Sequence, residues 1–167
     1  YRGPRLPERT LVIAVSQSGE TADTLASVRL AREMGCPVLS ICNAPGSTLL
    51  RESDAGLLTQ AGPEIGVAST KAFTCQLAVL AALAAHLAVK KGRMDRAEET
   101  EVVRHLLEAP AALNAALAHD EDIAGMAHLI APARDVLYLG RGPDYPLALE
   151  GALKLKEISY IHAEGYA

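Results

Sequence analysis

The sequence predicts an α/β protein in which a parallel sheet is flanked by helices. Residues 10–17, "TLVIAVSQ", form an unbroken apolar run of strand length, which is typical of a strand buried on both faces of a parallel sheet. An amphipathic stretch and a second apolar run follow, so the order strand, helix, strand indicates a βαβ unit. The same order returns late in the chain.

The elements of the first half follow one another closely. Residues 19–35 carry apolar side chains at helical spacing and end at Gly35, which suits the C-terminal cap of a helix. The next stretches predict a strand, a short helix and a third strand, at residues 36–43, 47–54 and 55–62.

A long helix is expected after the third strand. Ser69 or Thr70 can cap it, and it runs to Gly92 with apolar positions on all sides, so most of its faces should be buried. Its most apolar part, residues 77–89, includes His86 and fits a buried core helix better than a membrane span. We therefore expect no membrane segment, and no signal peptide is visible.

The second half repeats the early pattern. Residues 93–119 predict a helix interrupted near Pro110, and residues 122–133 a short one. The stretch "RDVLYLGRGPDYPLALEGALKLKEISYI" then predicts strand, Gly-containing turn and helix. Because "LVIAVSQSG" and "DVLYLGRGP" are weakly similar, we expect two copies of one α/β fold. We assign residues 1–92 to the first copy, which lacks its beginning, and residues 93–122 to a helical linker. Residues 123–167 are the second copy, which lacks its end.

Bulk composition excludes some function classes. The net charge of −4 argues against a nucleic-acid-binding protein, which usually carries a basic face. Three cysteines without C-x-x-C spacing indicate reduced thiols in a cytoplasmic protein. Metal-binding spacing such as H-E-x-x-H is absent, so no metal is expected. The chain starts without Met and ends without a helix stop signal, which we interpret as a piece of a longer chain.

The segment that joins the first strand to its helix is a candidate ligand site. Ligands of open parallel sheets bind beyond the carboxyl ends of strands. A helix beginning near Ser18 or Gly19 leaves unpaired N–H groups at a partly positive end. Ser16, Ser18 and Thr21 add hydroxyl donors, so this segment can hold a phosphate without Lys or Arg.

The same segment has a simpler interpretation. Ser, Thr and Asp cap helices generally, and Glu20 in the first turn suits the helix dipole without any ligand. Gln17 adds an amide that could reach a sugar oxygen. Neither a P-loop nor G-x-G-x-x-G is present, so nucleotide binding is not supported. The local pattern leaves phosphate binding and plain capping both open.

A second candidate site lies on the last predicted helix. At about 100° per residue, Glu150, Lys154 and Glu157 fall within roughly 60° of one another and form one stripe. The helix is apolar nearly all round, so the stripe is expected to be partly buried. A carboxylate there can have a raised pKa, tempered by the Lys, as a general base for proton abstraction next to a carbonyl requires. The alternative is an ordinary ion pair on a solvated face.

Three motifs in order resemble a known enzyme family over essentially the whole chain. They are "SQSGETADTL", "EIGVASTKAFTCQL" and "GRGPDYPLALEGALKLKEISYIHAE". They resemble the isomerase part of the glutamine–fructose-6-phosphate aminotransferase family, which is built from two sugar isomerase (SIS) domains. The resemblance implies the flavodoxin-like, three-layer α/β/α fold of the SIS domain.

The resemblance also implies roles for individual residues. In that family the hydroxyl-rich loop and the "GVAST" segment hold the sugar phosphate, and the corresponding residues here are Ser16, Gln17, Ser18, Thr21, Val67 and Ser69. The family's general base moves a proton between C1 and C2 of the sugar. It corresponds to Glu157, with Lys154 and Glu150 beside it.

Some of the family pattern lies outside this sequence. The glutaminase domain with its nucleophilic Cys is absent, as are the opening strand and helix of the first SIS domain with a Gly-Thr-Ser segment. The sequence stops before the family's ring-opening His and its C-terminal Schiff-base Lys, and His162 falls too early to be that His. Gly165 stands where the family usually has Ala, which we interpret as a minor change at a helical position.

The resemblance therefore implies part of a cytoplasmic enzyme that converts fructose 6-phosphate to glucosamine 6-phosphate with ammonia from glutamine. No cofactor is implied, and the isolated chain is expected to be inactive. The implied partners are the sugar phosphate, a second copy in a homodimer, and the glutaminase domain of the full-length chain; nucleic acid and membrane are not. Two alternatives stay open: a non-catalytic phosphosugar-sensing SIS module and a deaminating sugar-phosphate isomerase. Glu157 in register with Lys154 favours an enzyme.

Overall fold

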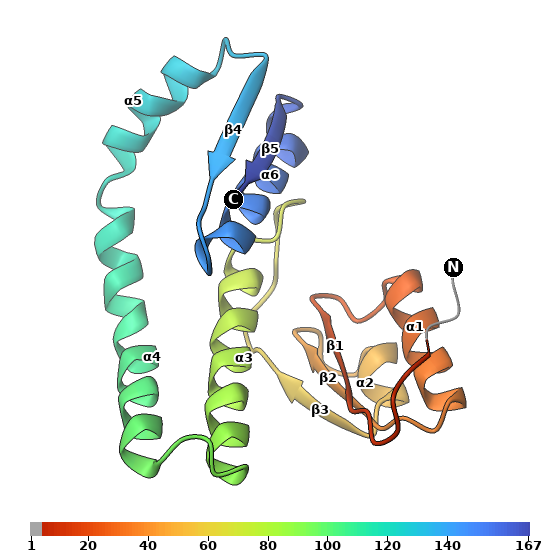
Figure 1. Cartoon of the computed structure of the whole chain (residues 1–167). Coiled ribbons are helices and arrows are strands. Elements are labelled where there is room, and N and C mark those ends of the chain that lie inside the picture. Colours follow the sequence, from red (N-terminus) through yellow and green to blue (C-terminus); the bar gives the residue numbers. More distant parts are fainter. Residues whose placement is uncertain (1–4) are drawn as a thin grey trace. The chain divides into compact units, whose positions relative to one another are not determined.

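The computed structural model describes residues 5–167, which form two compact units (Figure 1). Unit 1 consists of the residues up to Ile65 together with Ser69–Val103, and unit 2 consists of Gly66–Ala68 with Arg104–Ala167. Each unit is described by itself. Every strand pairing among the described residues is parallel, which confirms the predicted α/β class with parallel strands flanked by helices.

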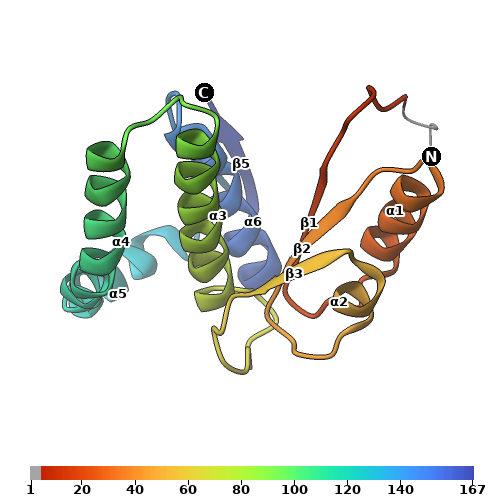
Figure 2. The ribbon, with the colours of Figure 1, turned by 90° about the horizontal axis from the view of Figure 1, so that it is seen from below.

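Unit 1 is built on a three-stranded sheet in the order β1-β2-β3. Its strands are β1 (Val12–Ser16), β2 (Val38–Cys42) and β3 (Ala55–Leu58). Two helices connect them and lie on the same face of the sheet, α1 (Ala22–Glu33) and α2 (Thr48–Glu52) (Figures 1 and 2). Because Ser16 pairs with Cys42 and Cys42 with Leu58, the carboxyl ends of all three strands meet at one edge.

The core of unit 1 lies between the sheet and these helices. α1 buries Leu25, Val28 and Ala31 at helical spacing. They pack with Ala14, Val38, Cys42 and Leu49. The central strand β2 is buried along most of its length.

The first strand is less buried than its sequence predicts. Ile13 is 40% exposed and Val15 is 37% exposed, while the alternate residues Ala14 and Ser16 are buried. The prediction that this strand is buried on both faces is therefore wrong. β1 is an edge strand of the sheet, and its described neighbours cover one side of it well and leave the other half-exposed.

α3 (Lys71–Lys90) follows the sheet, with Thr70 as its N-cap. The Thr70 side chain makes no capping hydrogen bond; Glu64 Oε2 instead accepts the N–H of Ala72 at 3.1 Å. Only Ala72 and Ala85 of this helix are buried, so the prediction that most of its faces are buried is wrong within the described structure. Apolar periodicity shows which faces can be buried, but burial needs neighbours, and the described residues supply few.

α3 also bears on the membrane prediction. It is long and apolar enough to cross a membrane by length and composition alone, with a mean hydropathy of 1.9. The core helices of soluble proteins meet the same criterion, so this property does not distinguish between the two.

Unit 2 contains a second strand–helix–strand arrangement. β4 (Asp135–Leu139) pairs with β5 (His162–Tyr166), and α6 (Asp144–Ser159) connects them, as α1 connects β1 to β2. α4 (Arg96–Leu117), whose residues up to Val103 belong to unit 1, and α5 (Asp120–Ile130) precede this arrangement. α4 runs through Pro110 over its 22 residues, so the predicted interruption of this helix is wrong.

β5 corrects the expectation that the sequence ends in a helix. α6 stops at Ser159, and Tyr160 takes the left-handed conformation, with φ 61°, that closes the helix. Gly165 therefore lies in a strand, where an added Cβ would come within 2.9 Å of the backbone N of Leu149 in α6. Its interpretation as a minor change at a helical position is wrong, since glycine allows the strand to approach the helix closely here.

An ion pair joins α1 to α2. The carboxylate of Glu52 accepts hydrogen bonds from Arg29 Nε at 2.8 Å and Arg29 Nη2 at 2.7 Å, and its backbone carbonyl accepts one from Arg32. The hydrogen bond from Arg29 holds the pKa of Glu52 below its usual 4.5 and raises the pKa of Arg29. Both helices are thereby held against the same face of the sheet.

This ion pair predicts a pH-dependent contribution to stability. Because the pKa of Glu52 is lower in the folded than in the unfolded chain, its stabilisation is complete above about pH 5 and is lost as the pH falls through the folded pKa. Glu52→Gln should therefore lower the unfolding midpoint at pH 7, and the gap to wild type should close as the pH falls through the folded pKa. Thermal unfolding followed by circular dichroism measures this gap, with Glu8→Gln as a control that shows none. A gap that stays constant from neutral to acidic pH would contradict the prediction.

Candidate functional site

The first candidate site is the turn between β1 and α1. Ser16 is the last residue of β1, and Gly19 takes a left-handed conformation with φ 67°. α1 begins at Ala22 with Thr21 as its N-cap. The helix thus starts later than the predicted Ser18 or Gly19, because a left-handed residue cannot belong to a right-handed helix.

Hydroxyl groups organise this turn and keep the capacity to donate. Ser16 Oγ accepts the N–H of Gly19 at 3.0 Å, and Ser18 Oγ accepts the N–H of Glu20 at 3.2 Å. Each hydroxyl retains its own hydrogen for another acceptor. Thr21 makes no side-chain hydrogen bond to α1, so the simple capping alternative lacks its expected bond. The turn thus presents hydroxyl donors beside a helix N-terminus, an arrangement that suits an anion.

The backbone of the turn is attached to the segment that joins β2 to α2. The carbonyl of Gln17 accepts the N–H groups of Asn43 and Ala44, each at 3.2 Å, and the carbonyl of Gly19 accepts that of Leu49 at 3.0 Å. The attachment is tight at Gly19, where an added Cβ would lie 2.6 Å from Ser47 Cβ and 2.8 Å from Cys42 Sγ. Glycine is therefore required here for space as well as for its left-handed conformation.

Glu20 does not act as its position in the sequence suggests. It lies before the N-cap of α1 rather than in the first turn, and its Oε1 accepts the N–H of Thr48, the first residue of α2, at 2.7 Å. This hydrogen bond lowers the pKa of Glu20. The expectation that Glu20 serves the dipole of its own helix is wrong, since the carboxylate is bonded to another helix.

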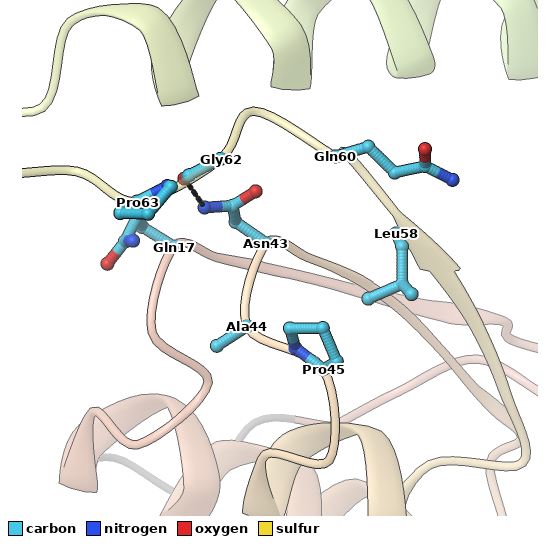
Figure 3. Close-up of a pocket in the computed structure, with 8 residues that line it drawn as sticks. All are labelled: Gln17, Asn43, Ala44, Pro45, Leu58, Gln60, Gly62 and Pro63. Atoms are coloured by element: carbon cyan, nitrogen blue, oxygen red, sulfur yellow. Dashed lines mark hydrogen bonds between the residues drawn. The ribbon is translucent and has the colours of Figure 1, made fainter.

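A pocket of about 430 Å³ opens at the same edge of the sheet (Figure 3). It is lined by Gln17, Asn43, Ala44, Pro45, Leu58, Gln60, Gly62 and Pro63. Of the predicted phosphate-binding residues only Gln17 lines it, and none of the lining residues is charged. The pocket therefore borders the turn without being the predicted phosphate site.

Asn43 shapes this pocket, and the sequence analysis missed it. Its Nδ2 donates to the carbonyl of Gly62 at 2.8 Å, while its Oδ1 accepts the Thr59 hydroxyl at 3.1 Å and the N–H of Ala61 at 2.8 Å. The side chain thus holds the segment that follows β3. A polar residue directly after an apolar strand was the available signal, the same one that pointed to the turn after β1.

The second candidate site, in unit 2, is the predicted stripe on α6. Lys154 Nζ lies 2.7 Å from Glu157 Oε2 and 3.4 Å from Glu150 Oε1, which confirms that these side chains share one face. They are partly buried, with exposed side-chain fractions of 23% for Lys154 and 34% for Glu157. The hydrogen bond to Glu157 raises the pKa of Lys154, so a positive charge stays beside both carboxylates. Of the two Glu157 carboxylate oxygens, it is Oε2 that accepts the hydrogen bond from Lys154.

The remaining predicted residues belong to the chain segment that follows β3 and precedes α3. Ser69 is half-buried and precedes the N-cap of α3 in unit 1. Val67 belongs to unit 2 and is 98% exposed. The structure thus gathers Ser16, Gln17, Ser18 and Thr21 in one turn and the three charged residues on one helix. Among residues 5–167 no cluster of His, Cys, Asp or Glu has the arrangement of a metal site.

The chain is similar in sequence to one domain family and to relatives that share one name. The SIS domain family matches residues 3–86. The chain is 66% identical over all 167 residues to a glutamine–fructose-6-phosphate aminotransferase [isomerizing] of Zymomonas mobilis subsp. mobilis. It is 56% identical to the protein of the same name from Brucella abortus biovar 1. The chain spans 28% of the length of each of these relatives.

A solved structure is similar over nearly the whole chain. It is the C-terminal domain of glucosamine-fructose-6-phosphate aminotransferase from Francisella tularensis, with a TM-score of 0.96 and 44% identity. The match covers 99% of this chain and 47% of that one. The strand and helix order described above is thus that of a known enzyme domain.

Proposed function

The chain belongs to the SIS domain family, and on this premise we propose that it is the phosphosugar-binding isomerase part of a glutamine–fructose-6-phosphate aminotransferase. The whole enzyme would convert fructose 6-phosphate to glucosamine 6-phosphate with ammonia from glutamine. The observation that carries the proposal is the hydroxyl-rich turn at the carboxyl end of β1, in a chain 66% identical to an enzyme of that name. This similarity supports an aminotransferase over a sensing module or a deaminating isomerase.

The turn is proposed to hold the phosphate group of the sugar. Ser16, Ser18 and Thr21 would donate hydroxyl hydrogen bonds, and the N-terminus of α1 would add backbone N–H groups and a partial positive charge. The amide of Gln17 lies at the border between the turn and the pocket, where it could reach a sugar oxygen. Val67 and Ser69 are proposed as further phosphosugar-binding residues, by resemblance to the family.

The stripe on α6 is proposed to carry out the isomerisation. Glu157 would take a proton from C1 of the sugar and return it to C2, as a general base and then a general acid. Lys154 keeps a positive charge beside it, and Glu150 shares that charge from the other side.

The same proposal includes the domain assignment and the properties of the full-length protein. Residues 1–92 are most of a first SIS domain and residues 123–167 the start of a second, with a helical linker between them. The full-length protein would act in the cytoplasm as a homodimer and carry a glutaminase domain. The chain spans 28% of its relatives, so the isolated 167 residues are proposed to lack turnover.

Ser18→Ala tests the phosphate site. It removes one hydroxyl donor from the turn, so the affinity for fructose 6-phosphate should fall about tenfold. The buried Ser40 provides a matched control, because Ser40→Ala deletes a hydroxyl that bonds Ala55 within the sheet and should leave the affinity within about twofold. Calorimetry on the product of the complete reading frame measures both. Equal losses in the two variants, or none in either, would count against the phosphate site.

Glu157→Gln tests the proton transfer. The amide cannot act as a base, so isomerase turnover should fall at least about a hundredfold. Phosphosugar affinity should stay within about twofold, because the phosphate is held elsewhere. Glu164→Gln makes the same chemical change on β5 and should keep turnover. Turnover that survives in Glu157→Gln would remove Glu157 from this role.

A further inference from the structure

Glu20 connects the phosphate-binding turn to α2. Its Oε1 accepts the N–H of Thr48 at 2.7 Å, at the first residue of that helix. Ser47, the N-cap of α2, makes no side-chain capping bond of its own. Glu20 therefore supplies from a distant part of the sequence the cap that α2 lacks.

This bond completes the attachment of the turn. The carbonyls of Gln17 and Gly19 already accept N–H groups from residues 43–49. Those bonds hold the backbone up to Gly19. The side-chain bond of Glu20 extends the attachment by one residue, to the position directly before Thr21, the N-cap of α1. The turn is thus fixed on the side that faces α2, which leaves the hydroxyls of Ser18 and Thr21 for a ligand.

The direction of the Glu20 carboxylate also matters for charge. A carboxylate directly before an N-cap can turn towards its own helix, occupy the N-terminal N–H groups and repel an anion there. Here it is bonded to α2 instead. The hydrogen bond from the Thr48 N–H lowers the pKa of Glu20, followed by one from the Thr48 side chain and a smaller contribution from Arg51, against opposing effects of burial and Glu52. The negative charge is thus bonded at the N-terminus of α2.

We propose that Glu20 is a positioning residue for phosphate binding, which holds the turn through α2 and keeps its own charge off the N-terminus of α1. This inference rests on the proposed function of the turn as the phosphate site. It assigns Glu20 no contact with the sugar. Its effect should therefore appear in substrate binding rather than in the chemical step.

The test compares variants of Glu20 in the product of the complete reading frame. Glu20→Ala loses the tether, so KM for fructose 6-phosphate should rise about tenfold while kcat stays within about twofold. Glu20→Gln keeps an acceptor oxygen and removes the charge, so its affinity for the phosphosugar should equal or exceed that of wild type. Glu33→Ala removes an exposed carboxylate from the other end of α1 and should change neither parameter. A role limited to stability would lower the unfolding midpoint without this split between KM and kcat.

The other end of the bond gives an independent test. Thr48→Pro removes the N–H that Glu20 accepts, at the first position of a helix, where proline is tolerated. It should reproduce the rise in KM, and adding Glu20→Ala to it should cause no further rise. Thr48→Ala keeps the N–H and loses only the side-chain contribution to Glu20, so its KM should rise less than that of Thr48→Pro. If Glu20→Ala does not fold, Thr48→Pro decides alone.

The outcomes separate this inference from the proposed function. If wild type binds fructose 6-phosphate and both Glu20→Ala and Thr48→Pro bind it equally well or more tightly, the positioning role of Glu20 is wrong and the phosphate site stands. If wild type does not bind the phosphosugar, the proposed function itself is wrong.

Discussion

The attachment of the β1–α1 turn to the β2–α2 connection is the constraint on which the candidate site depends. Parallel pairing places Ser16 beside Cys42, and the carbonyls of Gln17 and Gly19 then accept N–H groups from the residues that follow. The fit has no room for a side chain at Gly19. These bonds tie the turn to its neighbour without any ligand, and preorganised donors bind an anion better than mobile ones do.

This constraint explains how an anion site can form without a cation. Residues 15–25 contain no Lys or Arg. The N-terminus of α1 supplies partial positive charge, and hydroxyls already aligned by their bonds to Gly19 and Glu20 supply donors. The nearby acid, Glu20, is bonded to α2. The proton transfer that we propose is assigned to a different element, α6, where Lys154 lies between two carboxylates. Binding and chemistry are thus assigned to different elements.

Local patterns predicted most of the fold and both candidate sites, because strand runs, helical spacing and Gly turns are properties of neighbouring residues. The wrong predictions concern features that depend on residues far away in the sequence. α1 starts late because Gly19 takes a left-handed conformation, at a place where Ser47 and Cys42 leave no room for a side chain. The roles of Glu20 and Asn43 depend on partners in other loops.

The burial predicted for α3 and for the second side of β1 requires neighbours that a sequence pattern cannot count. Gly165 was assigned to a helix because no local signal marked the end of α6 at Tyr160.

The most direct test of the central claim is a crystal structure of the product of the complete reading frame with fructose 6-phosphate bound. The phosphate oxygens should lie within about 3 Å of the hydroxyls of Ser16, Ser18 and Thr21, with no Lys or Arg side chain in contact with them. A phosphate held by a Lys or Arg side chain at another place, with residues 16–21 unliganded, would contradict the account.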